Sequence, residues 1–359
     1  MFSKPSKFED TVSACNKMNV KVLSKNKLSY LMRDSFPAVY STLSPQALIE
    51  LVVNNYDLGS VDKCLLWNRG LSDIYLVESE TKTLILRISH HHWRSHSEID
   101  FELKLLDFLH QRHLPVAYPI STLDNALYVT IPALEGDRYA ALFPYAEGSV
   151  PLGDLNPTQS EIFGATLGKL HDTGSDFTYG APPKALNLEY LLDNSLNTIL
   201  PFLQEYSEDW DYLQQKADKM KEQLVDLPQE APYWGICWGD PHSGNAHFTS
   251  DDNITIFDFD QCGYGWRAFD IAKFLHVSLS AGISRKVRDA FFEGYRQIQS
   301  LTEEELNCLQ ALTQMAHIWS WAINIEAAAI HCWSRLDRSY FKKRLEHLKC
   351  LDSSSWQLF

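Results

Sequence analysis

Oxygen-bearing side chains gather in one short, turn-rich stretch of the sequence. Asp240, Asn245 and Asp258 lie among glycines and short apolar runs in the segment ICWGDPHSGNAHFTSDDNITIFDFDQCGYGWRAFD. Carboxylate and amide oxygens suit a hard cation such as Mg²⁺, which shares its remaining positions with substrate phosphates. A carboxylate at position 240, five residues before Asn245, could accept a proton from a hydroxyl group. The residue types therefore suit metal-assisted transfer of a phosphoryl group.

The competing interpretation is that these three residues only form turns, since Asp and Asn stabilise turns beside glycine. The spacing of Asp240 and Asn245 taken alone favours that interpretation, because short motifs often match by chance. Two further features favour chemistry. The apolar sequence IFDFD carries Asp258 thirteen residues after Asn245, and a helix is predicted to start at Phe269 and Asp270.

The predicted elements divide the chain into two parts. Strand patterns lie at residues 64–67, 74–77, 83–88, 126–131 and 139–143, with a helix at 97–109 and an earlier helix that begins at Ser44 and Pro45. Helical periodicity then dominates residues 158–225 and 269–348, and a β-like insert at 234–265 separates these two blocks. Strands followed by helices indicate an α+β arrangement of two lobes and not a doubly wound sheet.

Composition excludes several classes of protein. Of the 359 residues, 45% are hydrophobic and 12% aromatic, which is enough for a core and excludes a disordered chain. No run of about 18 uncharged apolar residues occurs, so we expect no membrane partner. The first residues lack the apolar segment of a signal peptide, and the seven cysteines are widely spaced without a CxxC. We therefore expect a cytoplasmic protein with unpaired thiols.

The net charge of −14 is unevenly distributed along the chain. Residues 1–33 carry seven Lys and Arg against two acidic residues, a balance of +5, so the remainder carries −19. This acidic body argues against a nucleic-acid partner, because neutralising phosphates needs a basic face. It mildly favours a substrate that bears an amine. The basic start is expected to be a poorly ordered extension, which we place at residues 1–43.

The motif WGDPHSGN, followed by IFDFDQCGYGWRAFDIAKFL, resembles the aminoglycoside phosphotransferase / choline kinase-like superfamily. The family pattern is H-G-D-x-H-x-x-N, then an apolar segment with I-D-F/W-D/E, then a G-x-x-x-x-D-L/I-A helix. The segment GATLGKLHDTG is similar to the family's helix that ends in L-x-x-L-H. The resemblance covers roughly residues 55–280. It implies a protein-kinase-like bilobal fold, with a small β-rich N-lobe and a large, mostly helical C-lobe.

Carried over by position, the resemblance implies that Asp240 is the catalytic residue and that Asn245 and Asp258 bind the metal. Asp270 matches an aspartate with a structural role at the start of the following helix. The chain departs from the pattern at Trp238, where the family has histidine, which questions the geometry of the loop. A relative that binds nucleotide without turnover is therefore the alternative hypothesis.

The resemblance also implies nucleotide-binding residues in the first lobe. They lie in the turn 68–73, on the third strand, on the first lobe's second helix and at the hinge between the lobes: Gly70, Ser72, Arg87, Glu102, Phe143 and Tyr145. Each has a competing interpretation. The turn has one glycine and could be an ordinary hairpin, Arg87 could lie on an edge strand, and Glu98 is the alternative to Glu102.

The sequence thus predicts an ATP-dependent kinase that uses Mg²⁺ and phosphorylates a hydroxyl of a small molecule, with residues 44–143 as the nucleotide-binding N-lobe and 144–359 as the catalytic and substrate-binding C-lobe. The motifs GDRYAALFPYAEG and LPVAYPI look closest to the homoserine kinase and stress-response kinase branch. A third hypothesis is metal-dependent hydrolysis through His242 and His247.

Several other groups are weaker candidates. The histidines at 90–92 and 96 could bind a metal, although an exposed loop is the better prediction for them. Three tryptophans in the last helical block suit a helix core better than a substrate site: Trp319, Trp321 and Trp333. Three acidic residues could bind an ammonium group, but surface positions are the better prediction: Glu293, Glu326 and Asp337.

Overall fold

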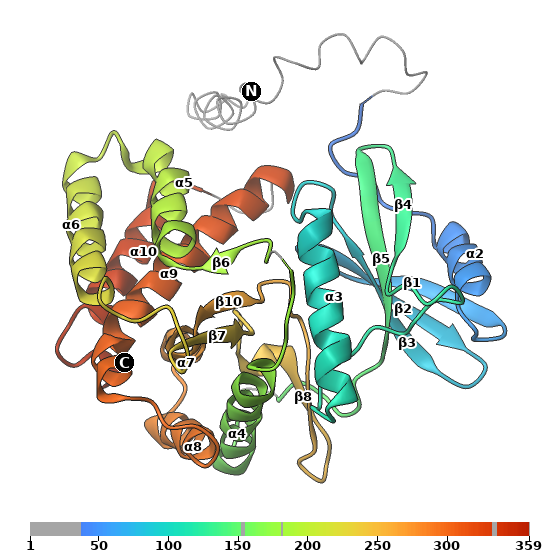
Figure 1. The fold of residues 1–359 in the computed structure, drawn as a ribbon. Coiled ribbons are helices and arrows are strands. Elements are labelled where there is room, and N and C mark those ends of the chain that lie inside the picture. Colours follow the sequence, from blue (N-terminus) through green and yellow to red (C-terminus); the bar gives the residue numbers. More distant parts are fainter. Residues whose placement is uncertain (1–36, 152–154, 181, 332–335, 359) are drawn as a thin grey trace.

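The computed structural model describes residues 37–151, 155–180, 182–331 and 336–358. Most of the predicted N-terminal extension, and Trp333, lie outside these ranges. Figure 1 shows two lobes side by side, with the strands of the first in blue to turquoise and the helices of the second in green to red. The fold is α+β and bilobal, as the sequence predicted.

The first lobe is built on a five-stranded antiparallel sheet with strand order β1-β2-β3-β5-β4. The strands are β1 Val61–Arg69, β2 Ser72–Ser79, β3 Thr83–Ser89, β4 Val129–Ala133 and β5 Gly136–Pro144. All five were predicted, although β1 and β2 extend further and β4 begins later than the pattern indicated. Because β3 is the central strand, Arg87 does not lie on an edge.

Two helices complete this lobe. Helix α2 (Pro45–Asn55) begins as predicted, since the Ser44 side chain accepts a hydrogen bond from the Ala47 backbone and Pro45 occupies the first turn. Helix α3 (His96–Gln111) starts with a reciprocal cap between Ser95 and Glu98. It lies between the sheet and the second lobe (Figure 1), so its side chains can reach both.

The second lobe consists mainly of helices: α4 Pro157–Gly174, η2 Glu189–Asp193, α5 Asn194–Leu203, α6 Ser207–Leu224, α7 Arg267–Ser280, α8 Arg285–Arg296, α9 Glu303–His331, α10 Arg338–Leu351 and η4 Trp356–Leu358. The predicted β-like insert contains β7 Trp234–Cys237, η3 Ser243–Asn245, β8 Ala246–Phe248, β9 Ile254–Ile256 and β10 Gly263–Trp266. Strand β6 (Ala185–Leu186) was not predicted. It has two residues, too short for a periodic pattern, and pairs in parallel with β10.

None of the helices in these four ranges combines the length and hydropathy of a segment that crosses a bilayer. The five cysteines that lie in the described parts of the chain are unpaired, as expected: Cys64, Cys237, Cys262, Cys308 and Cys350.

Helices α4 and α8 pack with their backbones in direct contact, because each places a glycine at the crossing. A Cβ atom at Gly164 would lie 1.9 Å from the Phe291 carbonyl oxygen, and one at Gly294 would lie 1.8 Å from the Glu161 carbonyl oxygen. Neither neighbour can move aside, since both are backbone atoms. This contact fixes the position of α4, which carries His171 to the base of the site described below.

We expect Gly164→Ala to lower the free energy of unfolding by about 1–3 kcal/mol, because the methyl group forces the two helices apart. Urea denaturation measures the change. The matched control is Gly180→Ala, because a Cβ at Gly180 meets nothing within 4 Å. Equal stability of the two variants would contradict the close packing of α4 on α8.

Candidate active site

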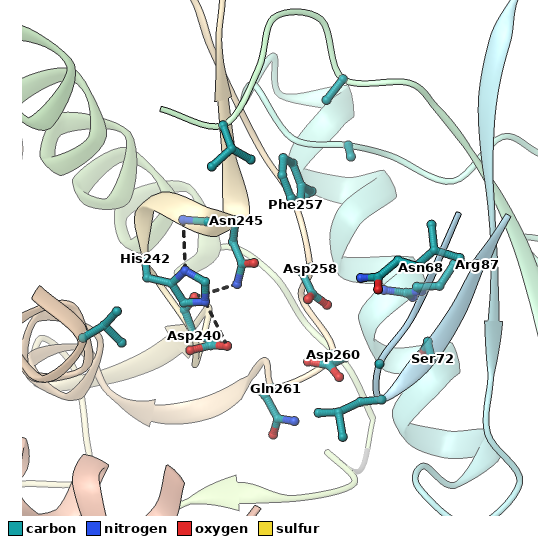
Figure 2. A pocket seen from close by; sticks show the side chains of 18 of the residues that line it. Asn68, Ser72, Arg87, Asp240, His242, Asn245, Phe257, Asp258, Asp260 and Gln261 are labelled. Carbon is teal, nitrogen blue, oxygen red and sulfur yellow. Dashed lines mark hydrogen bonds and ion pairs between the residues drawn. The ribbon is translucent and has the colours of Figure 1, made fainter. Parts of the chain in front are cut away.

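A cavity of about 910 Å³ lies between the two lobes. Eight of the nine site residues predicted from the sequence line it: Gly70, Ser72, Arg87, Phe143, Tyr145, Asp240, Asn245 and Asp258. The ninth, Glu102, lies behind Arg87 and contacts it. Figure 2 shows Asp240 and Asn245 on one side of this space, and Ser72 and Arg87 on the strands opposite.

Glu102 forms a buried ion pair with two arginines. Arg87 Nη1 and Nη2 donate to its two carboxylate oxygens at 2.6 and 2.7 Å, and Arg94 also donates to one of them. Burial alone would raise the pKa of Glu102, but the two guanidinium groups outweigh it and lower the pKa to about 2. Glu98, the alternative partner, instead caps α3 and pairs with Lys184 at 3.3 Å. Arg94 was not identified from the sequence.

Asp270 organises the loop that carries Asp240. Its carboxylate accepts hydrogen bonds from the backbone nitrogens of Trp238 (2.7 Å) and Gly239 (2.8 Å), and from His171 Nε2 (3.0 Å). Gly239 has φ +87°, and a Cβ there would lie 2.2 Å from the Gln261 carbonyl oxygen, so only glycine fits. The structural role expected for Asp270 is therefore that of a clamp on the backbone just before Asp240.

Trp238 replaces the family's histidine without freeing the loop. Its indole nitrogen donates to the Asp258 carbonyl oxygen at 3.0 Å, and its ring stacks on Phe259 with centroids 5.2 Å apart. The side chain is fully buried. Trp238 thus links the Asp240 loop directly to the segment that carries Asp258, which answers the doubt that the substitution raised about loop geometry.

Asn245 is fixed by contacts within the same loop. Its amide nitrogen donates to the Asp240 carbonyl oxygen at 3.1 Å, as drawn in Figure 2, and its backbone oxygen accepts from the Phe257 backbone nitrogen at 3.0 Å. The amide oxygen is then the atom of this side chain that suits a metal ion.

Asp258 and Asp260 place two carboxylates in the cavity (Figure 2). Asp260 is buried, whereas Asp258 exposes part of its surface to the cavity. The protein atoms around Asp258 exclude surrounding water and raise its pKa well above its ordinary value, the charge of Asp260 raises it further, and Arg87 offsets only part of this. Oxygen donors with uncompensated negative charge fit a divalent cation. Asp260 was not identified, although two carboxylates at a spacing of two in IFDFD could have indicated a common face.

Asp240 forms ion pairs with two basic side chains. Lys273 Nζ lies 3.1 Å from Oδ1, and His242 Nε2 lies 3.5 Å from Oδ2. Burial acts to raise the pKa of Asp240, but Lys273 first and His242 second reverse this and lower the pKa below its ordinary value. The carboxylate still exposes 27% of its surface, enough for a ligand to reach it. The sequence contained no indication of these ion-pair contacts of Asp240.

Lys273 is the main residue that sequence reasoning missed. It follows Asp270 by three residues on α7, so one helix carries both the clamp on the Asp240 loop and the counter-charge of Asp240. Its ammonium group also donates to Ser320 Oγ at 2.7 Å and lies 5.2 Å from the centre of the Trp319 ring. Trp319 and Trp321 both belong to the helix core as expected, and Trp319 also lines the cavity.

The histidines do not form a metal centre in the described ranges. His242 Nδ1 accepts from the Gly244 backbone at 3.0 Å, whereas His247 Nδ1 donates to the Ala146 carbonyl oxygen at 2.7 Å. The only described trio of His, Cys and acidic side chains close enough to share an ion is His171, Cys237 and Asp270, and hydrogen bonds occupy all three.

One expectation for the histidines at 90–92 was wrong. His90 is buried instead of exposed, and its Nε2 lies 3.4 Å from Asp73 Oδ1. Neighbouring His91 is exposed and its Nδ1 bonds to the Asp137 carbonyl oxygen at 3.1 Å. These contacts give both residues structural roles in the first lobe.

A protein-kinase-like bilobal fold, with a cavity between the lobes that carries three carboxylates, defines the class of this protein. The family model described as "Phosphotransferase enzyme family" matches residues 66–307, and the chain belongs to that family. It therefore belongs among the enzymes that transfer phosphoryl groups.

The chain is similar to several known proteins. An uncharacterized protein of Synechocystis sp. is 54% identical over 326 residues, which cover 91% of this chain and 90% of the relative. The structure of the amicoumacin kinase hAmiN, in complex with AMP-PNP, Ca²⁺ and its substrate, aligns with a TM-score of 0.69 at 20% identity, covering 87% of this chain and 94% of that one. A microcompartment-associated aminopropanol kinase aligns with a TM-score of 0.69 at 19% identity, covering 85% and 95%. The last two similarities establish the fold.

We expect Glu102→Gln to lower the free energy of unfolding by about 3–5 kcal/mol, because it leaves two buried guanidinium groups without a counter-charge. The control is Glu78→Gln, which breaks an ion pair with Lys63 whose side chains are 39% and 47% exposed, and costs less than about 1 kcal/mol. Denaturant titrations measure both variants, and equal losses would contradict the prediction.

The same measurement over pH provides a second check. The folded-state pKa of Glu102, about 2, lies below the unfolded value of about 4.3. Its stabilising effect is therefore complete above the unfolded pKa and disappears as the pH falls from about 5 toward 2. The difference in free energy of unfolding between the parent protein and Glu102→Gln should become smaller over that pH interval.

Proposed function

We propose that the protein is an ATP-dependent kinase that transfers the γ-phosphoryl group of ATP to a hydroxyl of a small molecule, with Mg²⁺ as the metal. The observation that carries this proposal is the convergence of Asp240, Asn245 and Asp258 on one cavity, opposite Arg87. Membership of the phosphotransferase family supports it.

We assign nucleotide binding to the first lobe and the hinge. Arg87 lines the cavity with 11% of its side chain exposed, and Glu102 fixes its orientation, so its guanidinium group suits a phosphate oxygen. Gly70 lies in the turn between β1 and β2, and Ser72 begins β2; both line the cavity, so we place this turn over the same phosphates. Phe143 and Tyr145 lie at the end of β5, where the backbone suits the adenine ring.

We assign the metal to Asn245, Asp258 and Asp260, whose oxygen atoms and negative charge suit Mg²⁺ better than a softer ion. When bound, Mg²⁺ would neutralise charge on the phosphates of the nucleotide. The pKa of both carboxylates is raised, so a cation that they hold would stabilise their ionised forms.

Asp240 orients the acceptor. Its depressed pKa makes it a weak base, so its main task is to hold the hydroxyl group in line with the γ-phosphorus atom. The bond between the γ-phosphorus and the bridging oxygen breaks, a bond from the γ-phosphorus to the acceptor oxygen forms, and the hydroxyl proton passes to Asp240. The products are ADP and the phosphorylated acceptor.

The alternative of a nucleotide-binding protein without turnover depended on Trp238 in place of histidine. The indole hydrogen bond to the Asp258 segment preserves the link between the two loops, so we favour the enzyme. We assign residues 44–143 to nucleotide binding and 144–359 to catalysis and acceptor binding. The unpaired thiols of the five described cysteines support a reducing compartment such as the cytoplasm.

The pair Asp240→Ala and Asp258→Ala tests the proposal. Asp240→Ala should abolish transfer, a loss of at least about 10²-fold, while Mg–ATP binding survives because Asp240 is not a nucleotide ligand. Asp258→Ala should instead lose Mg–ATP affinity, because it removes a metal ligand. Calorimetry with and without Mg²⁺ measures binding, and ADP release with a panel of alcohols measures turnover.

The isosteric variant Asp240→Asn should reproduce the loss of turnover with the fold intact, and Asp289→Ala, on the surface of α8, is the control for mutagenesis itself. Turnover by Asp240→Ala at the parental rate would refute the assignment of Asp240. Mg–ATP binding without turnover by the parent protein, on every acceptor, would favour the alternative.

Lys273→Met should move the acidic limb of the kcat profile to higher pH. Only the ionised carboxylate of Asp240 can accept the proton, and Lys273 is the charge that lowers its pKa most. Removing that charge raises the pKa, so activity is lost at a higher pH on acidification. Lys104→Met is the control, since Lys104 pairs with Asp100 on α3 and does not line the cavity. An unchanged acidic limb would contradict the role of Lys273.

A further inference from the structure

One half of the cavity belongs entirely to the second lobe. Beyond Asp240 it is lined by side chains from α7, α9 and α10: Lys273, His276, Ser280, Trp319, Ser320, Asn324 and Arg344. The residues that we assign to nucleotide binding line the opposite half of the cavity, next to the first lobe and the hinge. On the proposed function, on which this inference rests, the half beyond Asp240 receives the acceptor.

The charges in this half are positive. Among the described residues, the carboxylates that line the cavity are Asp240, Asp258 and Asp260, and the proposed mechanism commits all three to the hydroxyl or to the metal. Lys273 and Arg344 contribute the remaining formal charges of the acceptor half. An ammonium group placed there would therefore meet cations.

The acidic residues that the sequence offered for an ammonium group lie elsewhere. Glu293 pairs with Arg296 on the surface of α8, and Asp337 caps α10 by accepting from the Tyr340 backbone. Glu326 accepts from Thr198 and lines a separate cavity of about 90 Å³. The acidic net charge of the chain favoured an amine-bearing acceptor. Apart from Asp240, however, no acidic side chain of the described residues lines the half of the cavity that would receive the amine.

Arg344 is the cation without an ionic partner. Lys273 is balanced by Asp240, whereas no carboxylate in the described part of the chain lies in ion-pair contact with Arg344. Helix α10 is anchored at this position, because the Arg344 carbonyl oxygen accepts a hydrogen bond from His317 Nε2 at 2.9 Å. The Arg344 guanidinium group lies 5.2 Å from the centre of the Tyr340 ring, a contact that carries no formal negative charge, so an anionic ligand would supply the counter-charge that the described residues do not.

The remaining side chains of this half do not favour a cation. The Trp319 ring, the natural surface for an ammonium group, already faces the Lys273 ammonium at 5.2 Å. His276 is buried, and burial, reinforced by the charge of His317, lowers its pKa well below the ordinary value, so it is neutral near pH 7. His276 therefore contributes no charge that would attract an ammonium group.

We propose that the acceptor is an anionic hydroxy compound, whose carboxylate or phosphate binds Arg344 while its hydroxyl faces Asp240. The planar guanidinium group can donate two parallel hydrogen bonds to either anion.

Matched compounds that share a carbon skeleton test the proposal: glycerol, 3-amino-1,2-propanediol, glycerate and glycerol 3-phosphate, with glucose, glucosamine, gluconate and glucose 6-phosphate as a longer set. Calorimetry measures their binding to the protein loaded with Mg²⁺ and AMP-PNP, and ADP release measures transfer. We expect an anionic member to bind about 10- to 100-fold more tightly than its neutral and amine counterparts. The carboxylate and phosphate members distinguish the two anions.

Arg344→Gln should abolish this preference and raise the KM of the anionic acceptor about 10- to 100-fold, with the KM of Mg–ATP unchanged. Arg344→Lys should recover part of the affinity, because it restores the charge without the fork of donors. Arg338→Gln is the matched control, since Arg338 lies on the same helix but pairs with Asp209 outside the cavity.

Several outcomes would overturn the inference: tighter binding of an amine or neutral member, no binding of any anionic member at millimolar concentration, or an unchanged preference in Arg344→Gln. These differ from failure of the proposed function, which would be seen as absent Mg–nucleotide binding, or as turnover that is insensitive to Asp240→Ala.

Discussion

The site depends on one buried carboxylate, that of Asp270, which accepts three hydrogen bonds from two distant segments of the chain. Two donors are the backbone nitrogens just before Asp240, and the third is His171 at the end of α4. Hydrogen bonds to an ionised acceptor are among the strongest in proteins, and this acceptor is fully shielded from water. Because the same helix carries Lys273, the position of the Asp240 backbone and the charge state of its side chain are determined together.

The two lobes differ in how far their acidic side chains are balanced by positive charge. In the first lobe, Glu102 neutralises Arg87 and Arg94 within a buried cluster, so Arg87 is oriented before any ligand arrives. In the second lobe, Asp258 and Asp260 lie close to the same cavity with too little positive charge around them, and the pKa of each is raised. The first arrangement provides rigidity, and the second provides a binding energy that is released when a cation enters. Trp238 links the second arrangement to the Asp240 loop through its indole nitrogen.

The sequence predicted the parts of this protein that are encoded by short-range patterns. Alternating apolar residues located the five strands, and the motif from Trp238 to Asp258 placed Asp240 and Asn245 in one loop. Contacts between distant segments left no comparable signal. Arg94 reaches Glu102, Lys273 reaches Asp240, and Arg344 reaches the cavity only because helices from separate parts of the chain converge. Strand β6 was missed for a related reason, since its two residues gain strand geometry from pairing with β10. Asp260 is different, because its spacing from Asp258 was visible in the sequence.

Helix α10 begins at Arg338, beyond residue 307, where the match to the phosphotransferase family ends. The stretch that carries Asp240, Asn245, Asp258 and Asp270 lies wholly inside that match. On the proposed function, the reacting groups and Arg344 are thus encoded in separate lengths of the polypeptide. Exchanging α9 and α10 for the helices of another family member would replace many of the residues that line the acceptor half of the cavity. It would leave Asp240, Asn245 and Asp258 in place, so the two helices form a unit that can be redesigned separately.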